Sequence, residues 1–419
     1  MKICIFEDEK FDQFYPLTYF RPIFELKCGA TKLREKIERF YKDCEVSYWM
    51  REVLVPVFKK QLPRVNHWDA LKGDDVIFIN GRLLLLDNND IPSLLGGEEV
   101  GMKDGSVLYA RVKKERMATR MLTDFHSFIG QLQSELPTKE VNFHIISYPW
   151  NLVHHNGAAV KSDFAYFGGP SIEGEIHSQA CIYGDKNVRI AKGAKVHPFV
   201  VLDTTLGPIM IEEGAEILPF ARIEGPTSIG KNTLILGAAR IREGTSIGPM
   251  CRVGGEVEES IIHGHSNKYH DGFLGHAYLC EWVNLGALTT NSDLKNDYST
   301  VSVYMKGQLM DSGDTKVGSF IGDHTKTSIG VFMNTGASLG VMCNVVANGS
   351  VTPKFIPSFC WFLNNSFSKG YGFKMQVDTA RIAMSRRKVN LTDEDIALMK
   401  YVHEITKTER ENAVAKSRM

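Results

Sequence analysis

The stretch that decides the fold runs from Ile211 to Val253 and reads IEEGAEILPFARIEGPTSIGKNTLILGAARIREGTSIGPMCRV. An aliphatic residue recurs at every sixth position, namely at Ile211, Ile217, Ile223, Ile229, Ile235, Ile241, Ile247 and Val253. A step of six fits neither the 3.6-residue period of a helix nor a simple strand alternation. It fits short strands separated by tight corners, whose residues must tolerate unusual φ and ψ.

The same step recurs on both sides of this stretch. Upstream it links Ile176, Ile182 and Val188, and then, after a slip of two, Ile190, Val196 and Leu202. Downstream it links Ile321, Thr327, Met333, Leu339, Val345 and Val351. Stacked corners predict a parallel β-helix with a three-sided section, in which one aliphatic residue per side points inward.

The segment KYHDGFLGHAYLCEWVNLGALTTNSDLKN, residues 268–296, combines this step with polar side chains. Because Phe273, Leu279 and Leu285 are six apart, we expect them to fill the coil. We expect the polar residues of the segment to lie outside it: His270, His276, Asn284 and Asn291. Residues 291–298 and 311–314 break the period, which predicts projecting loops, where functional sites are often built.

Composition excludes several classes of protein. The 419 residues carry no formal net charge, so no global field favours nucleic acid or an anionic membrane. The eight cysteines form no CxxC pair, which argues against a structural zinc site or a disulfide framework. The opening MKICIFEDE lacks the features of a signal peptide, and no apolar run approaches the roughly 20 residues of a membrane span. We expect a cytoplasmic protein.

The remaining parts differ from the repeat. In the first half, short apolar runs such as KICIF and VNFHIISY alternate with charged stretches, a pattern typical of an α/β layered domain. After Pro357 the repeat ends, and Thr392 followed by three acids predicts a helix start. Ile396, Met399, Val402 and Ile405 would line one face of that helix. We predict an α/β domain over 1–155, a β-helix over 156–357 and a helical tail over 358–419.

Two short motifs in the repeat resemble a known family. HDGFLG (270–275) and NLGALT (284–289) are similar to the H-x-x-Y-L-G and N-x-G-A-G-T segments of the GlmU acetyltransferase domain, and ARIR (239–242) is similar to its A-R-x-R segment. The resemblance implies a left-handed β-helix, acetyl-CoA as a substrate and a homotrimer with sites between subunits. It also implies that His270 is the catalytic base, Asn284 orients the reactants and Arg240 binds the sugar phosphate. Phe273 would line the acceptor, with Ala287 and Thr289 beside acetyl-CoA.

The chemistry suits these residue types. A His with a pKa near neutrality can take the proton of an attacking amine. An Asn amide can orient the amine or the thioester carbonyl, and Arg binds phosphate bidentately. Two departures affect the acceptor, because Glu258 replaces a substrate-binding Lys and Phe273 replaces a Tyr. The acceptor is therefore expected to be an aminosugar, but it need not be glucosamine-1-phosphate. The alternative for His270 is a solvated residue of the coil or a hydrogen bond at a corner.

A metal site is a further alternative. His263, His265 and His270 resemble zinc ligands of the γ-class carbonic anhydrases, but residues 225–240 contain no third His two coils earlier. The basic residues Arg386, Arg387 and Lys388 form either a solvated face or a contact for CoA phosphates.

The first half resembles sugar nucleotidyltransferases. PLTYFRPIFELKCGATKLREKIER (16–39) is similar to their signature, with Arg21-Pro22 in place of Lys-Pro, and VIFINGRLLL (76–85) is similar to a strand that there ends in Gly-Asp. The resemblance implies a nucleoside triphosphate, a sugar-1-phosphate bound by Thr18 and Arg21, and Mg²⁺. Here Gly81 is followed by Arg82, and no glycine follows the strand 3–6. Either Asp8, Asp12, Asp74 or Asp75 supplies the metal site, or this domain does not transfer nucleotides.

Across nearly the whole chain, the pattern resembles a GlmU-like group of sugar nucleotidyltransferases, including the YPW segment at 148–150. The resemblance implies a transferase that makes or modifies an activated aminosugar of the UDP-N-acetylglucosamine type. The alternative is a binding or regulatory protein that keeps both folds and has lost one or both chemistries.

Overall fold

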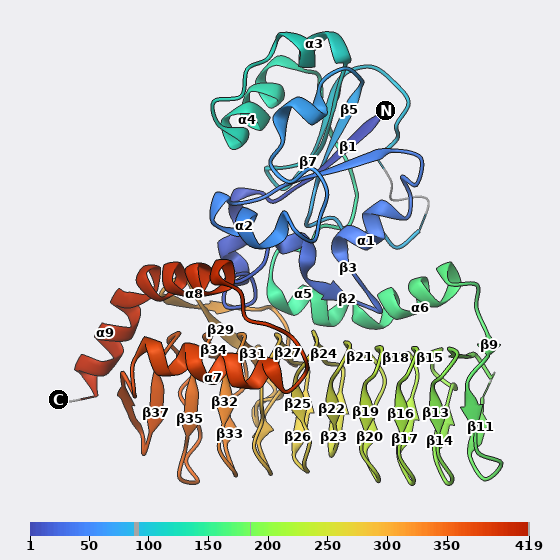
Figure 1. Ribbon diagram of the computed structural model, residues 1–419, viewed down its shortest axis with the longest axis vertical. Helices are drawn as coiled ribbons and strands as arrows, with labels where there is room; N and C mark the ends of the chain where they lie inside the picture. The colour runs from blue at the N-terminus through green and yellow to red at the C-terminus, as the bar shows by residue number, and fades with distance from the viewer. Residues whose placement is uncertain (88–91, 185, 418–419) are drawn as a thin grey trace. The chain divides into compact units, whose positions relative to one another are not determined.

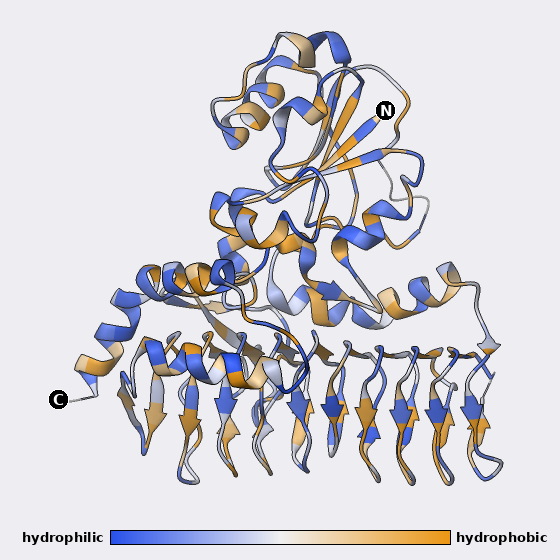
Figure 2. Cartoon of the chain, viewed as in Figure 1, coloured by the Kyte–Doolittle hydropathy of each residue, from blue (hydrophilic) through white to orange (hydrophobic). Residues whose placement is uncertain are grey.

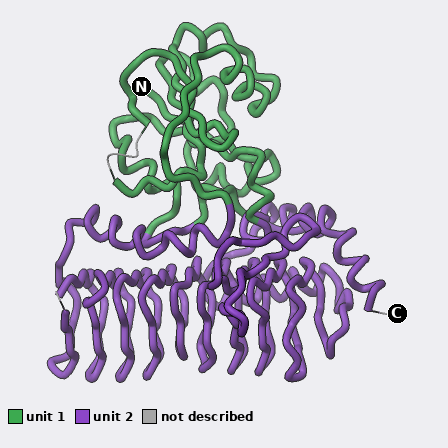
Figure 3. The backbone as a smooth tube through the Cα atoms, turned by 180° about the vertical axis from the view of Figure 1, so that it is seen from behind, with its two compact units in different colours: residues 1–14, 20–26, 31–147 green, residues 15–19, 27–30, 148–419 purple. Residues whose placement is uncertain are grey.

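The computed structural model describes residues 1–87, 92–184 and 186–417. The chain forms two compact units (Figure 3). The first contains Met1–Phe14, Phe20–Leu26 and Thr31–Ser147, and the second contains Tyr15–Tyr19, Lys27–Ala30 and Tyr148–Met419. None of the helices in the described ranges is long and apolar enough to cross a membrane.

The first unit is built on a six-stranded sheet, as expected for an α/β domain. Its strands lie in the order β4 (Glu45–Trp49), β1 (Lys2–Phe6), β5 (Val76–Asn80), β7 (Ser106–Val112), β6 (Glu99–Lys103), β8 (Thr138–Glu140). The strand β1 is parallel to β4 and β5, whereas β7 is antiparallel to its neighbours. KICIF and VIFIN are apolar on both faces because layers cover both sides of these central strands.

Helices and short turns cover this sheet. Phe125 and Phe128 of α4 belong to one apolar cluster with Phe6 and Phe78. The helical elements are η1 (Glu9–Phe14), η2 (Ile23–Glu25), α1 (Leu33–Glu38), η3 (Glu52–Leu54), α2 (Val55–Phe58), η4 (Trp68–Leu71), α3 (Lys114–Thr119) and α4 (Phe125–Glu135). The short strands β2 (Lys27–Cys28) and β3 (Thr31–Lys32) also lie in this part of the sequence.

The second unit is a parallel β-helix with three faces (Figure 1). Sheet I contains β9 (Ser171–Ile172), β12 (Val188–Ile190), β15 (Ile209–Ile211), β18 (Thr227–Ile229), β21 (Thr245–Ile247), β24 (Ile261–Ile262), β27 (Tyr278–Leu279), β31 (Phe320–Ile321), β34 (Ser338–Leu339) and β36 (Phe355–Ile356). Sheet II contains β10 (Glu175–Ile176), β13 (Lys195–Val196), β16 (Glu216–Ile217), β19 (Leu234–Ile235), β22 (Arg252–Val253) and β25 (Asn267–Lys268). Sheet III contains β11 (Cys181–Tyr183), β14 (Val201–Asp203), β17 (Arg222–Glu224), β20 (Arg240–Ile241), β23 (Glu256–Glu258) and β26 (Phe273–Gly275).

Later coils continue these faces. Asn284 bridges β25 to β32, so β32 (Lys326–Thr327), β35 (Asn344–Val346), β37 (Trp361–Leu363) and β38 (Ser366–Ser368) extend sheet II. The strand β28 (Thr290–Asn291) pairs with β33 (Phe332–Met333). The period breaks between them, where the antiparallel hairpin of β29 (Ser302–Met305) and β30 (Gln308–Asp311) is inserted.

The six-residue step positions the core as predicted. All eight aliphatic residues from Ile211 to Val253 are fully buried and belong to one continuous cluster. Figure 2 shows apolar and polar residues interspersed along the coil as a whole. Corners take the left-handed conformation even at non-glycine residues, for example Phe199, Phe220 and Ala238 with φ of 62°, 66° and 60°.

At a few positions the six-residue step does not predict burial correctly. Phe273 is only half-buried, and Leu274 points into the core instead, because the step from Leu274 to Leu279 is five residues and not six. Val351 is 58% exposed because it pairs with the exposed Phe332, and the next residue, Thr352, is buried instead. Ile176 and Ile182 are half-buried because the first coil has a neighbour on one side only. His276 and Asn291, expected outside, are buried.

Helices flank the coil. They are α5 (Pro149–His154), α6 (Asn156–Tyr166), α7 (Phe373–Ser385), α8 (Asp393–Ile405) and α9 (Lys407–Lys416). Thr392 caps α8 as predicted, and its hydroxyl accepts a hydrogen bond from the Asp395 amide at 3.2 Å. Met399 and Val402 are buried with Leu398, whereas Ile405 is 47% exposed. The buried face of α8 is therefore rotated from the predicted one.

Candidate functional site

A pocket of about 900 Å³ opens on sheet II, and we call it the sheet II pocket. His270, Asn284 and Ala287, which the sequence predicts to act together, all line it. The other lining residues are Arg252, His265, Asn267, Tyr269, Trp282, Val283, Leu285, Gly286, Lys326, Ile329, Ala383, Arg386 and Arg387. The coil and the end of α7 thus build one concave site.

His270 lies on the exposed corner between β25 and β26. Its ring meets the ring of Tyr269 edge-on, with the centroids 5.0 Å apart. Its backbone carbonyl accepts a hydrogen bond of 2.6 Å from the ammonium of Lys268. Because His270 is exposed and lines the pocket, its imidazole is accessible to solvent and to a ligand in the pocket, as a proton acceptor must be.

Asn284 belongs to a ladder of amides on the same face. It lies between Asn267 and Lys326, which are its bridge partners on the two neighbouring coils. The Asn267 amide donates to Asn284 Oδ1 at 3.2 Å, and the Arg387 guanidinium donates to Asn267 Oδ1 at 3.0 Å. This chain of hydrogen bonds connects the segment after α7 to Asn284.

The sheet II pocket is strongly cationic. Arg252, Lys326, Arg386 and Arg387 line it, and none of its described lining residues is an Asp or a Glu. Burial lowers the pKa of Lys326 to about 8. Burial, together with the neighbouring Arg252 and Arg386, lowers the pKa of Arg387. Crowded cations with no carboxylate among them favour an anionic ligand.

Flat rings form part of the wall. Trp282 stacks on His265 with centroids 4.4 Å apart and an interplanar angle of 21°. On its other side it lies 6.1 Å from the His324 ring at 13°. All three residues have positive φ and occupy the same corner of successive coils.

Other predicted site residues lie elsewhere in the second unit. Arg240 and Phe273 are on sheet III, where Glu256 lies between them in register. Arg240 is 66% exposed in its side chain and pairs with Glu256 at 2.7 Å. Thr289 is buried, and its hydroxyl lies 2.8 Å from that of Thr327. Within one chain, these three residues do not line the sheet II pocket.

Glu258, the acid that departs from the family pattern, is neutralised. It is 8% exposed and accepts a hydrogen bond of 2.8 Å from Arg242. The ammonium of Lys316 lies 3.8 Å from its other oxygen. The repulsion of a phosphate that Glu258 would cause is therefore offset by two cations.

The sequence analysis missed a buried cluster around His276. The imidazole lies 2.8 Å from Asp293 and 3.1 Å from Glu259. Burial lowers the pKa of His276, but the hydrogen bonds to Asp293 and Glu259 outweigh burial and raise it to about 9. The hydrogen bond to His276 lowers the pKa of Glu259. Positions 259, 276 and 293 are one coil apart, and this spacing is the signal that could have revealed the cluster.

The zinc interpretation finds no support. No group of three or more His, Cys, Asp or Glu with the geometry of a metal site occurs among the residues that the structure describes. Glu281 lies 3.4 Å from His263 and 3.9 Å from His265, whereas His270 occupies a different corner.

In the first unit, two arginine–carboxylate pairs follow β1. Arg82 is 1% exposed, and its Nε donates to both oxygens of Asp8 at 3.0 Å. Arg51 donates to Glu7 at 2.8 Å, and its guanidinium lies over the Phe11 ring at 4.0 Å. Arg82 is thus a structural partner of Asp8.

The acids proposed for Mg²⁺ do not converge. Asp8 and Asp12 follow β1, whereas Asp74 and Asp75 precede β5. Because Lys2 pairs with Val76 and Phe6 with Asn80, these two pairs of acids lie at opposite ends of the sheet. Asp75 also binds Lys113 at 2.8 Å. The described acids do not fit a shared Mg²⁺ site.

Thr18 and Arg21 are both buried. Thr18 belongs to the second unit, and Arg21 belongs to the first. The Arg21 carbonyl accepts a hydrogen bond of 3.0 Å from Arg51.

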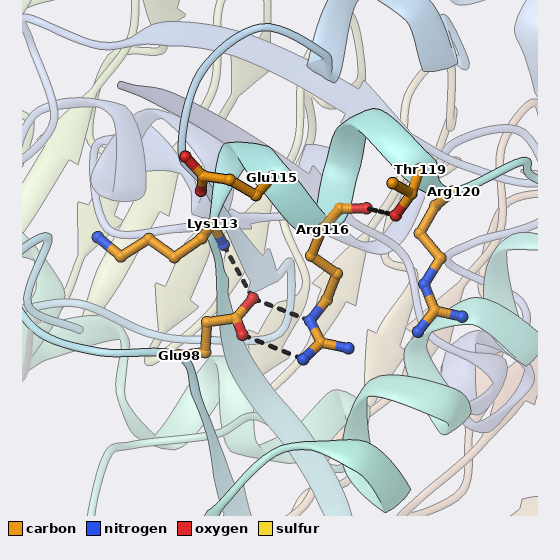
Figure 4. A pocket seen from close by; sticks show the side chains of 6 residues that line it. All are labelled: Glu98, Lys113, Glu115, Arg116, Thr119 and Arg120. Atoms are coloured by element: carbon orange, nitrogen blue, oxygen red, sulfur yellow. Dashed lines mark hydrogen bonds and ion pairs between the residues drawn. The ribbon is translucent and has the colours of Figure 1, made fainter.

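A second pocket, of about 680 Å³, lies in the first unit beside α3 (Figure 4). Glu98 accepts hydrogen bonds from the Lys113 amide at 3.1 Å and from Arg116 at 2.9 Å. Arg116 also binds Glu135 at 2.7 Å, and Arg120 binds the same carboxylate. The cations of this second pocket are therefore neutralised by carboxylates of the same unit, unlike the cations of the sheet II pocket.

Comparisons with known proteins agree with this architecture. Residues 3–169 match the model of the family described as "Sugar nucleotidyl transferase". A bifunctional sugar-1-phosphate nucleotidylyltransferase/acetyltransferase of Sulfurisphaera tokodaii is 37% identical over 90 residues, which are 22% of this chain and 22% of the relative. Bifunctional GlmU of Ralstonia pickettii is 32% identical over 164 residues (38% and 32%), and that of Methanococcus aeolicus is 32% identical over 165 residues (39% of each).

The matches are partial. The chain spans between about a fifth and two fifths of the length of these curated relatives. A solved UDP-N-acetylglucosamine acyltransferase of Francisella novicida is 14% identical, with 58% of this chain and 92% of that chain covered and a TM-score of 0.35. Residues 3–169 thus match the sugar nucleotidyl transferase family, and parts of the chain are similar to bifunctional GlmU proteins.

Proposed function

We propose that the chain is a bifunctional transferase of activated aminosugars. The β-helix transfers the acetyl group of acetyl-CoA to the amine of an aminosugar phosphate, and the first unit joins a sugar-1-phosphate to a nucleotide. The product would be a nucleotide sugar of the UDP-N-acetylglucosamine type. The proposal of acyl transfer rests on the sheet II pocket. His270 and Asn284 line this pocket together with four cationic residues, and none of its described lining residues is an Asp or a Glu.

The residues suggest a direct transfer. The amine attacks the thioester carbonyl while His270 accepts its proton, and the thiolate of CoA leaves and takes that proton up. The Asn284 amide hydrogen-bonds to the thioester oxygen, where negative charge develops. Ala287 forms the wall beside the acyl group, and Thr289 supports this wall from within through Thr327.

The cations suit the donor. Arg252, Arg386 and Arg387 would bind the phosphates of CoA, because guanidinium groups bind phosphate oxygens bidentately. Arg240 and Phe273 lie on the other side of the His270 corner, on sheet III. We propose that a homotrimer packs these faces together and thereby completes the acceptor site between subunits. We also place the enzyme in the cytoplasm.

The test is thiol release from acetyl-CoA with glucosamine-1-phosphate and a panel of other aminosugar phosphates. Turnover with one of these amines is expected, with a loss of at least a hundredfold in His270→Ala. His177→Ala, which removes another exposed His of the coil, is the matched control and should retain full turnover. Equal turnover in both variants, or none with any amine in the unaltered protein, would overturn the role of His270.

Nucleotidyl transfer rests on the family match of residues 3–169. It is tested by pyrophosphate release from nucleoside triphosphates and sugar-1-phosphates, with and without Mg²⁺. No group of three or more metal-ligating residues occurs in the described part of the chain, so the comparison with and without Mg²⁺ tests whether the metal is required. If neither assay shows turnover, the alternative of a binding or regulatory protein replaces the proposal.

A further inference from the structure

Lys268 occupies a position that belongs to the core of the β-helix. It follows Val253 in register on sheet II, and Leu285 takes the same place on the next coil. The other members of this column are aliphatic up to this coil: Ile176, Val196, Ile217, Ile235 and Val253. Lys268 is 2% exposed, so a charged side chain stands where the repeat calls for an aliphatic one.

A buried amine is costly unless its hydrogens are bonded. The Lys268 ammonium donates to the carbonyl of His270 at 2.6 Å and to the carbonyl of Gly254 at 3.0 Å. Burial lowers the pKa of Lys268 to about 8, which shows that the charged form is held at a cost. An aliphatic residue would fill the position without this cost, so core packing alone does not explain the lysine.

The two carbonyls belong to corresponding corners of consecutive coils. Gly254 precedes the turn from β22 to β23, and His270 lies in the turn from β25 to β26. A Cβ on Gly255 would lie 2.5 Å from the Lys268 ammonium, so the glycine at this corner leaves room for the ammonium. The amine therefore ties the corner that carries His270 to the corner that carries Gly254, one coil away.

We propose that Lys268 is a positioning residue for acyl transfer, which holds the backbone of His270 from inside the coil so that the imidazole points into the sheet II pocket. This inference rests on the proposed function, because it takes His270 as the base. Its physical basis is that a displacement of about 1 Å at a reacting group can lower the rate by two orders of magnitude. Holding the peptide fixes the direction in which the side chain leaves it.

The test compares Lys268→Met with Lys195→Met. Met fills the inward space without donating a hydrogen bond, and Lys195 is an exposed lysine on the same sheet. In Lys268→Met we expect kcat for acyl transfer to fall at least tenfold, with KM for acetyl-CoA within twofold of the unaltered protein. Hydrogen–deuterium exchange should increase over residues 254–256 and 269–273 only. Lys268→Gln, which keeps a shorter donor, should recover part of kcat.

Two results would overturn the proposal. One is an unchanged kcat and unchanged exchange at both corners in Lys268→Met. The other is increased exchange through all coils with kcat falling only in proportion to the unfolded fraction, which would indicate a purely structural role. If the unaltered protein turns over no aminosugar, the proposed function fails by itself, and the exchange data still decide whether Lys268 holds the corner.

Discussion

His276 shows at the residue scale how the coil accommodates charge. It is 3% exposed and lies between Glu259 and Asp293, so the imidazolium donates one N–H to each of two carboxylates from neighbouring coils. Asp293 begins the segment that leads into the β29–β30 hairpin. The cluster therefore lies where the coil leads into this inserted hairpin. An imidazolium in this environment is held by charge and hydrogen bonds against the cost of burial.

We therefore predict a pH-dependent stability. Because the pKa of His276 is raised from about 6.5 in an unfolded chain to about 9 in the folded one, its contribution is complete below pH 6.5. The contribution is lost as the pH rises through 9, and it amounts to at most about 3 kcal/mol. His276→Gln should lower the unfolding free energy at pH 6.5 by an amount that shrinks toward pH 10, measured by denaturant titration.

The comparison with the unaltered protein isolates His276. Burial lowers the pKa of Lys268 and of Lys326, which acts in the opposite direction, but both lysines are present in the two proteins. His177→Gln is the control at an exposed site and should leave the pH profile unchanged. A difference between His276→Gln and the unaltered protein that does not vary with pH would contradict the charge-based account.

At the scale of elements, two valines allow the burial that the six-residue step predicts to be compared with the burial in the coil. Val253 and Val351 both lie on the predicted step, but Val253 is fully buried and Val351 is 58% exposed. Val253→Ala should lower the unfolding free energy by about 2 kcal/mol, because it leaves a cavity in the core. Val351→Ala should change it by less than about 0.5 kcal/mol. Thermal and denaturant unfolding would measure both, and equal losses would show that the repeat position alone sets the cost.

The end of α7 provides a second prediction. Arg387, just after α7, lines the sheet II pocket and bonds to Asn267, whereas Arg381 is an exposed residue of α7. Arg387→Ala should raise KM for acetyl-CoA about tenfold, since one charge-assisted contact with phosphate contributes roughly 1.5 kcal/mol. Arg381→Ala should leave KM unchanged. Steady-state kinetics at two salt concentrations would measure this, and a similar KM in both variants would remove Arg387 from the donor site.

At the scale of the whole molecule, the two units have separate cores and should respond separately to mutation. Asp8→Asn leaves the buried Arg82 without its carboxylate, which typically costs 3 to about 5 kcal/mol. We expect faster hydrogen exchange in β1, β5 and β7 and unchanged acetyl-CoA turnover by the β-helix. Asp69→Asn, at an exposed acid of the first unit, is the control. Faster exchange spread over the coils in Asp8→Asn would show that the units unfold together.

Much of the molecule could be predicted from the sequence because its strongest signal is local. An aliphatic residue every six positions repeats a short-range geometric requirement, so the coils from Ile211 to Val253 follow it without exception. That His270 and Asn284 line one pocket could also be predicted, since they lie on consecutive coils. The positions of Phe273 and Lys268 could not, because steps of four and five residues, which end at Val257, Ile262 and Leu279, interrupt the regular step of six.

What the sequence by itself determined is the architecture: an α/β unit, a parallel β-helix and a capped C-terminal helix, each read from periodicity or local turn chemistry. Only the tertiary structure decided which charges meet. In the tertiary structure Arg82 pairs with Asp8, and Arg240 lies on a different face from the His270 pocket. Arg387 also bonds to Asn267, which is 120 residues away in sequence. The physical reason is that apolar burial depends on periodicity along the chain, whereas ion pairs and sites depend on distances in space between residues far apart in sequence.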